Sequence, residues 1–433
     1  MMTRRYLLFF TTILLLSKVY AQRQQNVLEL TPEQIEAIFI KQNLDLIAEK
    51  MSVSIADAAI AQARLWENPS LSIDGVNLWS TNAQRGGERE VIPPLFGSFA
   101  RNTQFSAELS QLVSLSGKRS KLIGMEKVSK EIAMAQFEDV LRGLKAELRK
   151  SVCEMIYLSS YRKVLETQSQ SLSLLIDTYT KQVAQGNLAK NELLRLQAAL
   201  FEAENELNEI QSALNGQQKN IKALLNAEPF VVIEILDGAR RIPNPEHYVL
   251  ADLTTSAMNA RPDVTKSKLQ TEYYGKSLKY EKSQRVPDVT FGVNYDRRGG
   301  VWHDFVGFSM GMEIPLFNRN QGNIKAAKLS ISQSSYQAKK QQNLVQQEVV
   351  EAYHNYAIAY GFYKKIDNNP LIGELDSMLE VYAHNLIGKN ISMLEYIDFM
   401  DTYKSTKQTW LTAQKNVSVQ FEELQYTVGT KIK

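Results

Sequence analysis

The sequence repeats one arrangement of elements in its two halves, and this duplication limits the possible folds more than any other feature. In each half, short stretches of alternating polar and apolar residues lead into a very long helical segment, which a hinge at Gly186 or Gly388 turns back. The first copy runs from Pro69 to Asn226 and the second from Pro287 to the C-terminus, with matching points roughly 200 residues apart. Such a repeat predicts a quasi-symmetric assembly in which short strands and long antiparallel helices meet end to end.

Length and charge narrow the class of protein. A chain of 433 residues is ordinarily expected to form two or three domains, whereas the repeat favours one elongated body. The net charge is only +3, and the chain lacks the clustered basic face that nucleic-acid binding requires. We therefore expect no nucleic-acid partner.

The N-terminus has the pattern of a secretory signal peptide over residues 1–21. Arg4 and Arg5 form its positive start, residues 7–16 are apolar, and Ala21 ends a small-residue cleavage site. No Cys follows that site, so a lipid anchor is not expected. Beyond it no apolar run reaches the ~18 residues of a membrane-spanning helix. The sequence predicts an exported protein without a helical anchor, and its single thiol, Cys153, is expected to be packed in an apolar stripe.

The prolines divide the chain into an ordered series of segments. Thr31-Pro32 is a good helix start, and this first helix is expected to run to about Trp66. The whole plan comprises a signal peptide at 1–21, a first repeat at 22–226, an equatorial connector at 227–262 and a second repeat at 263–433. The first repeat holds a helix, a strand pair at about 69–114 and a helical hairpin at 118–226; the second holds a helix, a strand pair at about 287–315 and a helical hairpin at 319–430.

Two periodicities support this plan. A period of two, typical of strands with one apolar face, is clear in Val289, Phe291, Val293 and Tyr295, and Gly75 interrupts the phase of the first strand as a β-bulge would. A heptad spacing, typical of coiled-coil packing, follows the first hinge in Leu193, Leu200, Leu207, Leu214 and Ile221. The helix expected from Lys118 to about Gln185 would extend ~100 Å, a length suited to a tube wall or stalk.

The strands allow two interpretations. They could form a small soluble sheet packed on the helices, or they could be the ~10-residue tilted strands of a membrane barrel. The second is favoured because little chain is left to cover their apolar face, and because Trp79 and Trp302 lie where an aromatic girdle would be. Four strands cannot close a barrel, and open edges are not tolerated in lipid. Three protomers would together provide a closed barrel of twelve strands.

Several short motifs carry a resemblance to a known family. They are Asn68-Pro69, the stretch from Leu109 to Arg119, Arg261-Pro262-Asp263, Val286-Pro287-Asp288, and the most specific, Ile314-Pro315-Leu316-Phe317-Asn318-Arg319-Asn320-Gln321-Gly322. Over essentially the whole mature chain, the sequence resembles the TolC-like outer-membrane efflux proteins, and more closely their CzcC/CusC-type branch associated with heavy-metal efflux.

The resemblance implies a mainly α-helical fold with a transmembrane β portion. It implies a homotrimer in the cell outer membrane, with a twelve-stranded barrel continuing into a periplasmic tunnel of helices. It also implies two protein partners, a periplasmic adaptor and an inner-membrane pump of the resistance-nodulation-division type. The expected function is a passive exit duct, with heavy-metal cations as cargo.

The hairpin tips are the candidate functional sites. Gly186, Leu188 and Ala189 resemble the tip motif through which family members meet adaptor hairpins, and Gly388, Ile391 and Ser392 are their counterparts. Beyond the second tip, Glu395 and Asp398 are three residues apart and share a helix face. Three-fold symmetry would give six carboxylates around the tunnel end, a ring that favours cations. The alternative for this pair is a solvated outer face.

An enzyme is not expected, and neither a cofactor nor a metal site is indicated. Gly117-Lys118-Arg119-Ser120 resembles a phosphate loop only superficially, because the earlier glycine is missing. His247, His303, His354 and His384 are scattered without ligand spacing. Two other functions remain open: a duct of the same fold for drugs or type I secretion, and a periplasmic coiled-coil adaptor without a barrel.

Overall fold

The computed structural model describes residues 27–77, 104–236, 242–298 and 302–432. The signal peptide and Trp79 therefore lie outside the described residues. The chain divides into two compact units, each built from segments of both repeats. Unit 1 comprises Met1–Ala48, Val140–Ala260 and Gln346–Lys433, and unit 2 comprises Glu49–Asp139 and Arg261–Val345. The division into two repeats thus remains a prediction about the sequence, because the compact units cut across it.

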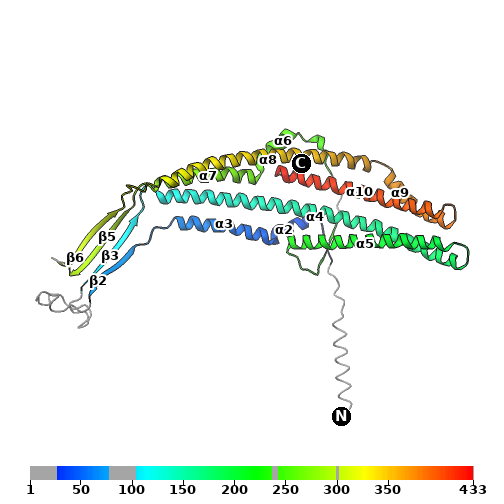
Figure 1. The fold of residues 1–433 in the computed structure, drawn as a ribbon, viewed down its shortest axis with the longest axis horizontal. Helices are drawn as coiled ribbons and strands as arrows, with labels where there is room; N and C mark the ends of the chain where they lie inside the picture. Colours follow the sequence, from blue (N-terminus) through cyan, green and yellow to red (C-terminus); the bar gives the residue numbers. More distant parts are fainter. Residues whose placement is uncertain (1–26, 78–103, 237–241, 299–301, 433) are drawn as a thin grey trace, which may run out of the picture. The chain divides into compact units, whose positions relative to one another are not determined.

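Unit 2 contains a four-stranded antiparallel sheet (Figure 1). Its strands are β2 (Ser70–Asn77), β3 (Gln104–Val113), β5 (Val289–Arg298) and β6 (His303–Met312), in the order β2-β3-β5-β6. The pairing of β3 with β5 joins the strand pairs of the two repeats into one sheet.

The expected irregularity at Gly75 is confirmed. The register between β2 and β3 shifts between Asp74 and Asn77, and Gly75 has a positive φ of 62°. Glycine adopts this left-handed conformation without steric cost, which explains its place at a bulge.

The helices of unit 2 adjoin the sheet. They are α7 (Pro262–Ser283) and the parts within this unit of α3 (Leu44–Ala63), α4 (Lys118–Ala184) and α8 (Gln321–Asp367). Where β3 leads into α4, Asp288 binds Lys118 Nζ at 2.8 Å and accepts a hydrogen bond from Leu115 N at 3.0 Å. This carboxylate, which precedes β5, therefore joins the two repeats at the strand–helix junction.

Unit 1 is built around two helical hairpins, one of α4 and α5 and the other of α9 and α10 (Figure 1). Its complete elements are β1 (Val27–Leu30), α2 (Pro32–Gln42), α5 (Lys190–Leu225), β4 (Val232–Ile235), η1 (Pro245–His247), α6 (Leu250–Ala260), α9 (Leu371–Ile387) and α10 (Met393–Val428). Strands β1 and β4 pair in parallel. Pro370 interrupts the long helical segment of the second repeat, because α8 ends at Asp367 and α9 begins directly after the proline.

The first helix was predicted to be continuous from Pro32 to about Trp66, and this prediction is wrong. It breaks at Asn43, which separates α2 from α3 and is buried. Asn43 Oδ1 accepts a hydrogen bond from Leu46 N at 2.9 Å, and its Nδ2 donates to Leu224 O at 2.8 Å. The side chain thus caps the start of α3 while binding the end of α5, so tertiary contacts override the helical pattern.

The predicted heptad of α5 faces the core of unit 1. Leu214 and Ile221 are buried, and so are Leu196, Ala203 and Leu224, each of which follows a residue of the heptad by three positions. Cys153 on α4 is also buried, as expected.

A charged cluster joins three helices of unit 1. Arg149 on α4 binds Glu36 of α2 at 2.8 Å and Glu422 of α10 at 3.1 Å, and Lys145 binds Glu36 at 2.6 Å. Burial raises the pKa of Glu36, but the hydrogen bonds and charges of Lys145 and Arg149 outweigh burial and leave the pKa below its ordinary value. The cluster therefore depends on an ionised Glu36.

Candidate functional sites in the sheet and the hairpin tips

The sheet has two chemically different faces. The strand register places Leu109, Val293 and Phe308 in one cross-strand row, and Ser110, Gly292 and Ser309 in the next. Because successive side chains alternate in direction, these rows belong to opposite faces. The apolar face comprises one polar residue, Gln111, and otherwise Leu71, Ile73, Ala107, Leu109, Val113, Val289, Phe291, Val293, Tyr295, Val306, Phe308, Met310 and Met312. The opposite face is polar or glycine apart from Leu112 and Phe305, and includes Ser70, Ser72, Asp74, Gln104, Ser106, Glu108, Ser110, Thr290, Gly292, Asn294, Asp296, Gly307, Ser309 and Gly311; Arg298 and His303 pair in the same phase at one end of the sheet.

The apolar face is exposed in the single chain. Phe308 is 87% exposed and Met310 is 67% exposed, and Leu71, Ile73 and Val306 are exposed as well. A continuous apolar surface of this kind marks a membrane or protein contact. Trp302, which directly precedes β6, is also exposed. This surface suits contact with lipid or with another apolar partner.

The first hairpin tip reverses the chain at Gly186. Its φ is 76°, Gly186 N donates to Val183 O at 3.0 Å, and Asn187 N donates to Gln182 O at 2.9 Å. This pair of bonds is the Schellman arrangement that ends many helices. The next two residues begin the return: Leu188 packs partly buried against the core beneath the tip, and Ala189 is the N-cap of α5.

The second tip was expected to reverse at Gly388, and the structure places the reversal one residue later. Gly388 has a φ of −73°, whereas Lys389 has the left-handed φ of 59°. Lys389 N donates to Leu386 O at 3.1 Å, and Asn390 N donates to Asn385 O at 2.8 Å, which repeats the bonds of the first tip. A lysine therefore occupies the position that Gly186 has in the first copy, and the two tips are matched from this residue onward.

The remaining residues of the second tip begin α10. Ile391 packs partly buried against the core beneath the tip, and Ser392 is the N-cap. Ser392 N donates to Glu395 Oε2 at 2.7 Å, and Glu395 N donates to Ser392 Oγ at 3.3 Å. These reciprocal bonds form a capping box. This role was not predicted, although the Ser392-x-x-Glu395 spacing is the sequence signal that indicates it.

One member of the acidic pair, Glu395, belongs to this capping box. Glu395 and Asp398 are both exposed on α10. Hydrogen bonds from the backbone and hydroxyl of Ser392 hold the pKa of Glu395 below its ordinary value. Glu395 therefore has a structural role in capping, and it remains negatively charged.

A shared core supports both tips. Buried residues of the α4–α5 hairpin pack with those of the α9–α10 hairpin, including Leu175, Leu196 and Tyr396. The Tyr396 hydroxyl lies 3.0 Å from Ser171 Oγ, and the rings of Tyr382 and Phe399 stack with centroids 4.0 Å apart. This packing holds the two tips of one chain together.

Polar links along the hairpins were not predicted from the sequence. Glu206 of α5 binds Lys404 of α10 at 3.0 Å and also accepts a hydrogen bond from Tyr161 of α4. Within the other hairpin, Lys407 of α10 binds Asp376 of α9. Single charged residues on heptad helices give no signal of their partners, which explains the omission.

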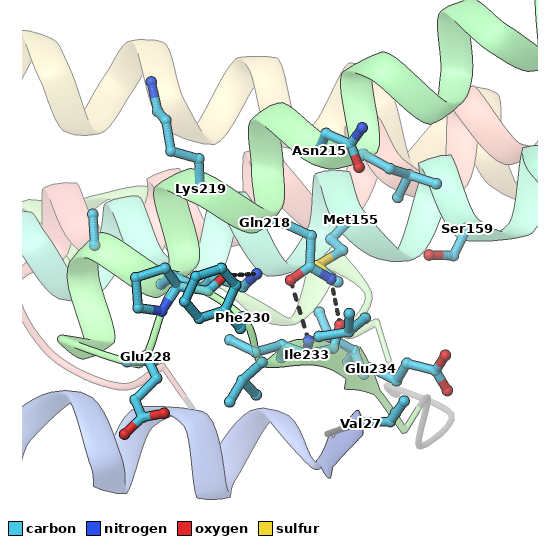
Figure 2. Close-up of a pocket in the computed structure, with 18 of the residues that line it drawn as sticks. Val27, Met155, Ser159, Asn215, Gln218, Lys219, Glu228, Phe230, Ile233 and Glu234 are labelled. Atoms are coloured by element: carbon cyan, nitrogen blue, oxygen red, sulfur yellow. Dashed lines mark hydrogen bonds between the residues drawn. The ribbon is translucent and has the colours of Figure 1, made fainter. Parts of the chain in front are cut away.

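A cavity of about 1440 Å³ lies between α4, α5 and the connector (Figure 2). Gln218 of α5 closes one side: it donates to Ile233 O at 2.6 Å and accepts from Ile233 N at 3.1 Å. Ser159 and Arg162 of α4 also line the cavity. The described lining contains a serine, an arginine, amides, lysines and carboxylates but no His or Cys, so it offers no imidazole or thiolate ligand for a metal ion.

Two features are absent from the described part of the chain. There, no group of three or more His, Cys, Asp or Glu side chains could hold a metal ion. Among the same residues, no helix is both long and apolar enough to cross a membrane.

Comparison with known proteins identifies relatives by sequence. A family model described as "Outer membrane efflux protein" matches residues 38–227. The cobalt-zinc-cadmium resistance protein CzcC of Cupriavidus metallidurans is 24% identical over 306 residues. That alignment spans 69% of this chain and 66% of CzcC, just under two thirds of the relative's own length.

Solved structures share the fold. The chain matches CusC with a TM-score of 0.70 and 17% identity, covering 92% of each chain. It matches the CmeC outer membrane channel of Campylobacter jejuni with a TM-score of 0.72 and 13% identity, covering 92% of this chain and 85% of that one. At these identities the likeness establishes the mainly helical fold with its strands.

Proposed function

We propose that this chain, whose residues 38–227 match the outer membrane efflux protein family, is the outer-membrane duct of a tripartite efflux system. In this role it provides a passive exit across the periplasm and the outer membrane. The observation that carries the proposal is the sheet of unit 2, which has an exposed apolar face and a polar face. Such a sheet suits a wall with lipid on one side and an aqueous lumen on the other.

Closure of that wall requires other copies of the chain. In the described sheet, β2 and β6 are the outer strands, and each leaves one backbone edge without a strand partner. Unpaired backbone groups cost several kcal/mol each in lipid, so open edges are excluded there. We propose that β6 of one protomer pairs with β2 of the next, and that three protomers form a twelve-stranded barrel above a tunnel of helices.

The hairpin tips are proposed to meet a periplasmic adaptor, which connects the duct to an inner-membrane pump of the resistance-nodulation-division type. The tip residues are Gly186, Leu188 and Ala189 in the first copy and Gly388, Ile391 and Ser392 in the second. The support is their geometry: both tips reverse with the same bonds, and Leu188 and Ile391 both pack against the shared core. Matched tips present two similar surfaces to adaptor hairpins.

Heavy-metal cations are the proposed cargo. The support is the relationship to CzcC, whose name refers to cobalt, zinc and cadmium resistance. A duct does not need a tight metal site, because conduction requires that ions leave as readily as they enter.

Deleting the gene is expected to lower tolerance to zinc, cobalt or cadmium, because export would stop at the outer membrane. Growth on graded metal concentrations measures this, with a plasmid copy as the complemented control and drug sensitivity tested in parallel. Unchanged tolerance to these metals and to copper and silver, together with increased drug sensitivity, would replace the metal assignment with a drug duct.

For the acidic pair we propose a role in cation selectivity at the tunnel end. The double variant Glu395→Gln with Asp398→Asn is expected to reduce the K⁺/Cl⁻ permeability ratio of the reconstituted channel, because it removes six charges from a trimer. Glutamine keeps the capping box, since Glu and Gln both serve at that position. The matched control is Glu192→Gln, which alters the equivalent position of the first copy, and identical ratios in the double variant and wild type would contradict the gate.

A further inference from the structure

We infer that Glu108, in the middle of β3, sets charge selectivity within the barrel wall by holding a carboxylate on the lumen side. This inference rests on the proposed duct function, because it assigns the polar face of the sheet to the lumen. It concerns a position in the sheet, separate from the acidic pair at the hairpin tip.

The carboxylate of Glu108 has a fixed position across three strands. Glu108 Oε1 accepts a hydrogen bond from Ser309 Oγ of β6 at 2.9 Å, although β5 lies between β3 and β6. The side chain therefore lies along the sheet and does not project away from it. A bond across an intervening strand restricts the rotamers of a long side chain and keeps its charge on the wall.

Gly292 of β5 makes this arrangement possible. A Cβ atom added at Gly292 would lie 2.5 Å from Glu108 Oε1 and 2.3 Å from Ser309 Oγ, both too close for real contacts. A glycine in the interior of a strand is unfavourable in itself and often marks a close approach by another group. Here the group is the carboxylate of Glu108.

In the next cross-strand row of this face, a glycine again allows a polar side chain to lie close over the backbone. A Cβ atom added at Gly307 of β6 would lie 2.4 Å from Asn294 Oδ1 of β5. Two glycines thus allow two polar side chains to lie flat over the strands. A flat polar layer leaves a wide lumen and still places charge on its wall.

The polar face carries three acidic residues near its middle rows. Asp74 and Asp296 accompany Glu108, and the register places Arg298 in the same phase at the far end of β5. Of the three acidic residues, Glu108 is the one whose carboxylate lies over Gly292, in the middle of the sheet. Three protomers would place three such carboxylates at one level of the barrel.

The dimensions decide whether such a ring can act on passing ions. Twelve strands spaced ~4.8 Å apart and tilted ~40° give a barrel radius of about 12 Å at the backbone. The Debye length is about 10 Å at 0.1 M salt and about 3 Å at 1 M. The ring therefore influences most of the lumen at low salt and little of it at high salt, so Glu108 should act through long-range attraction of cations.

The test is the reversal potential of purified trimers in planar bilayers under a KCl gradient at about 0.1 M salt. Glu108→Gln keeps the size of the side chain and an acceptor for Ser309, and it is expected to lower the K⁺/Cl⁻ permeability ratio about two-fold or more. Glu108→Asp keeps the charge and is expected to stay near wild type. The effect of Glu108→Gln should shrink at 1 M salt, where screening removes the field.

A second route avoids any assembly defect of the glutamine variant. Glu108→Cys, in a Cys153→Ser background, is assembled first and then modified in the bilayer with a cationic or an anionic thiol reagent. Opposite shifts of the permeability ratio support the inference, and equal ratios after both reagents overturn it. A cation-selective wild-type channel with an unchanged Glu108→Gln ratio would overturn this inference alone, whereas a wild-type protein that forms no channel would remove the duct function with it.

Discussion

Replacing Phe308 with arginine is expected to abolish heat-resistant trimers in the outer-membrane fraction. Phe308 lies in the middle of β6 on the apolar face and is 87% exposed in the single chain. In a barrel it would contact lipid near the membrane midplane. An arginine there costs about 2–4 kcal/mol, and three copies in a trimer raise this to about 6–12 kcal/mol, comparable with the whole stability of many proteins.

The direction in which Phe308→Arg changes stability distinguishes the proposed membrane barrel from a soluble sheet. If water surrounded this face, arginine at so exposed a position would change stability by about 0.5 kcal/mol or less and would improve solubility. Semi-native electrophoresis of membrane fractions, with and without heating, measures assembly directly. Normal trimers of Phe308→Arg would contradict the assignment of this face to lipid.

Ser110→Arg provides the matched control. Ser110 lies in the row next to that of Phe308, at nearly the same depth, but on the polar face. Substitutions on a lumen face are tolerated because the new charge remains in water. We expect Ser110→Arg to assemble, so the pair of variants tests the direction of each face and not merely tolerance of arginine in the sheet.

Patterns of period two and seven made the strands and long helices predictable from the sequence. The alternation around Phe291 and the heptad of α5 each reflect one buried or apolar face, and both recur along many residues. The bulge at Gly75 was also predictable, because a change of phase at a glycine within a strand is typical of a β-bulge.

Features that depend on a single residue, such as a helix break or a chain reversal, were harder to predict. The helix break at Asn43 depends on a hydrogen bond to Leu224, which is distant in sequence. No local sequence pattern predicts this break. The reversal at Lys389 was missed because glycine is the usual left-handed residue, and Gly388 stands beside it. The helix break depends on a tertiary hydrogen bond and the tip on a backbone angle, and neither can be read from the local sequence.

The candidate sites also differ in how far they could be predicted from the sequence. The tip residues could be proposed from a repeated motif, whereas the cradle of Gly292 under Glu108 required knowledge of which strands are neighbours. Glu108 and Ser309 are far apart in the sequence, and only the pairing of β3 with β5 and of β5 with β6 brings them together. Interactions that cross between repeats are therefore the ones that the sequence leaves open.

Replacing Arg149 with methionine is expected to destabilise unit 1 by about 3 kcal/mol, because removal of one partner from a buried ion pair typically costs 3–5 kcal/mol and this cluster is partly buried. The variant keeps the aliphatic volume but takes a cation from between Glu36 and Glu422, and Glu422 is only 6% exposed. Lys145 still neutralises Glu36, so most of the cost falls on Glu422.

Two controls set the scale for this prediction. Arg149→Lys keeps the charge but loses the two-sided hydrogen bonding, so an intermediate loss is expected. Lys404→Met removes a more exposed pair with Glu206 and should cost about 1 kcal/mol or less. Urea titration of the detergent-solubilised protein, followed by helical circular dichroism, ranks the three variants. A loss for Arg149→Met no larger than that for Lys404→Met would show that the cluster is solvated.

Acidification tests the same cluster without mutation. The folded pKa of Glu36 lies below its ordinary value of 4.5, so its ionised form contributes stability above that value. This contribution is lost as the pH falls from about 4.5 through the folded pKa, because protonation releases Lys145 and Arg149. Glu36→Gln should therefore be less stable than wild type at neutral pH, and the difference should shrink as the pH falls below about 4.5. A difference that stays constant over this range would mean that the glutamate acts through packing and not through its charge.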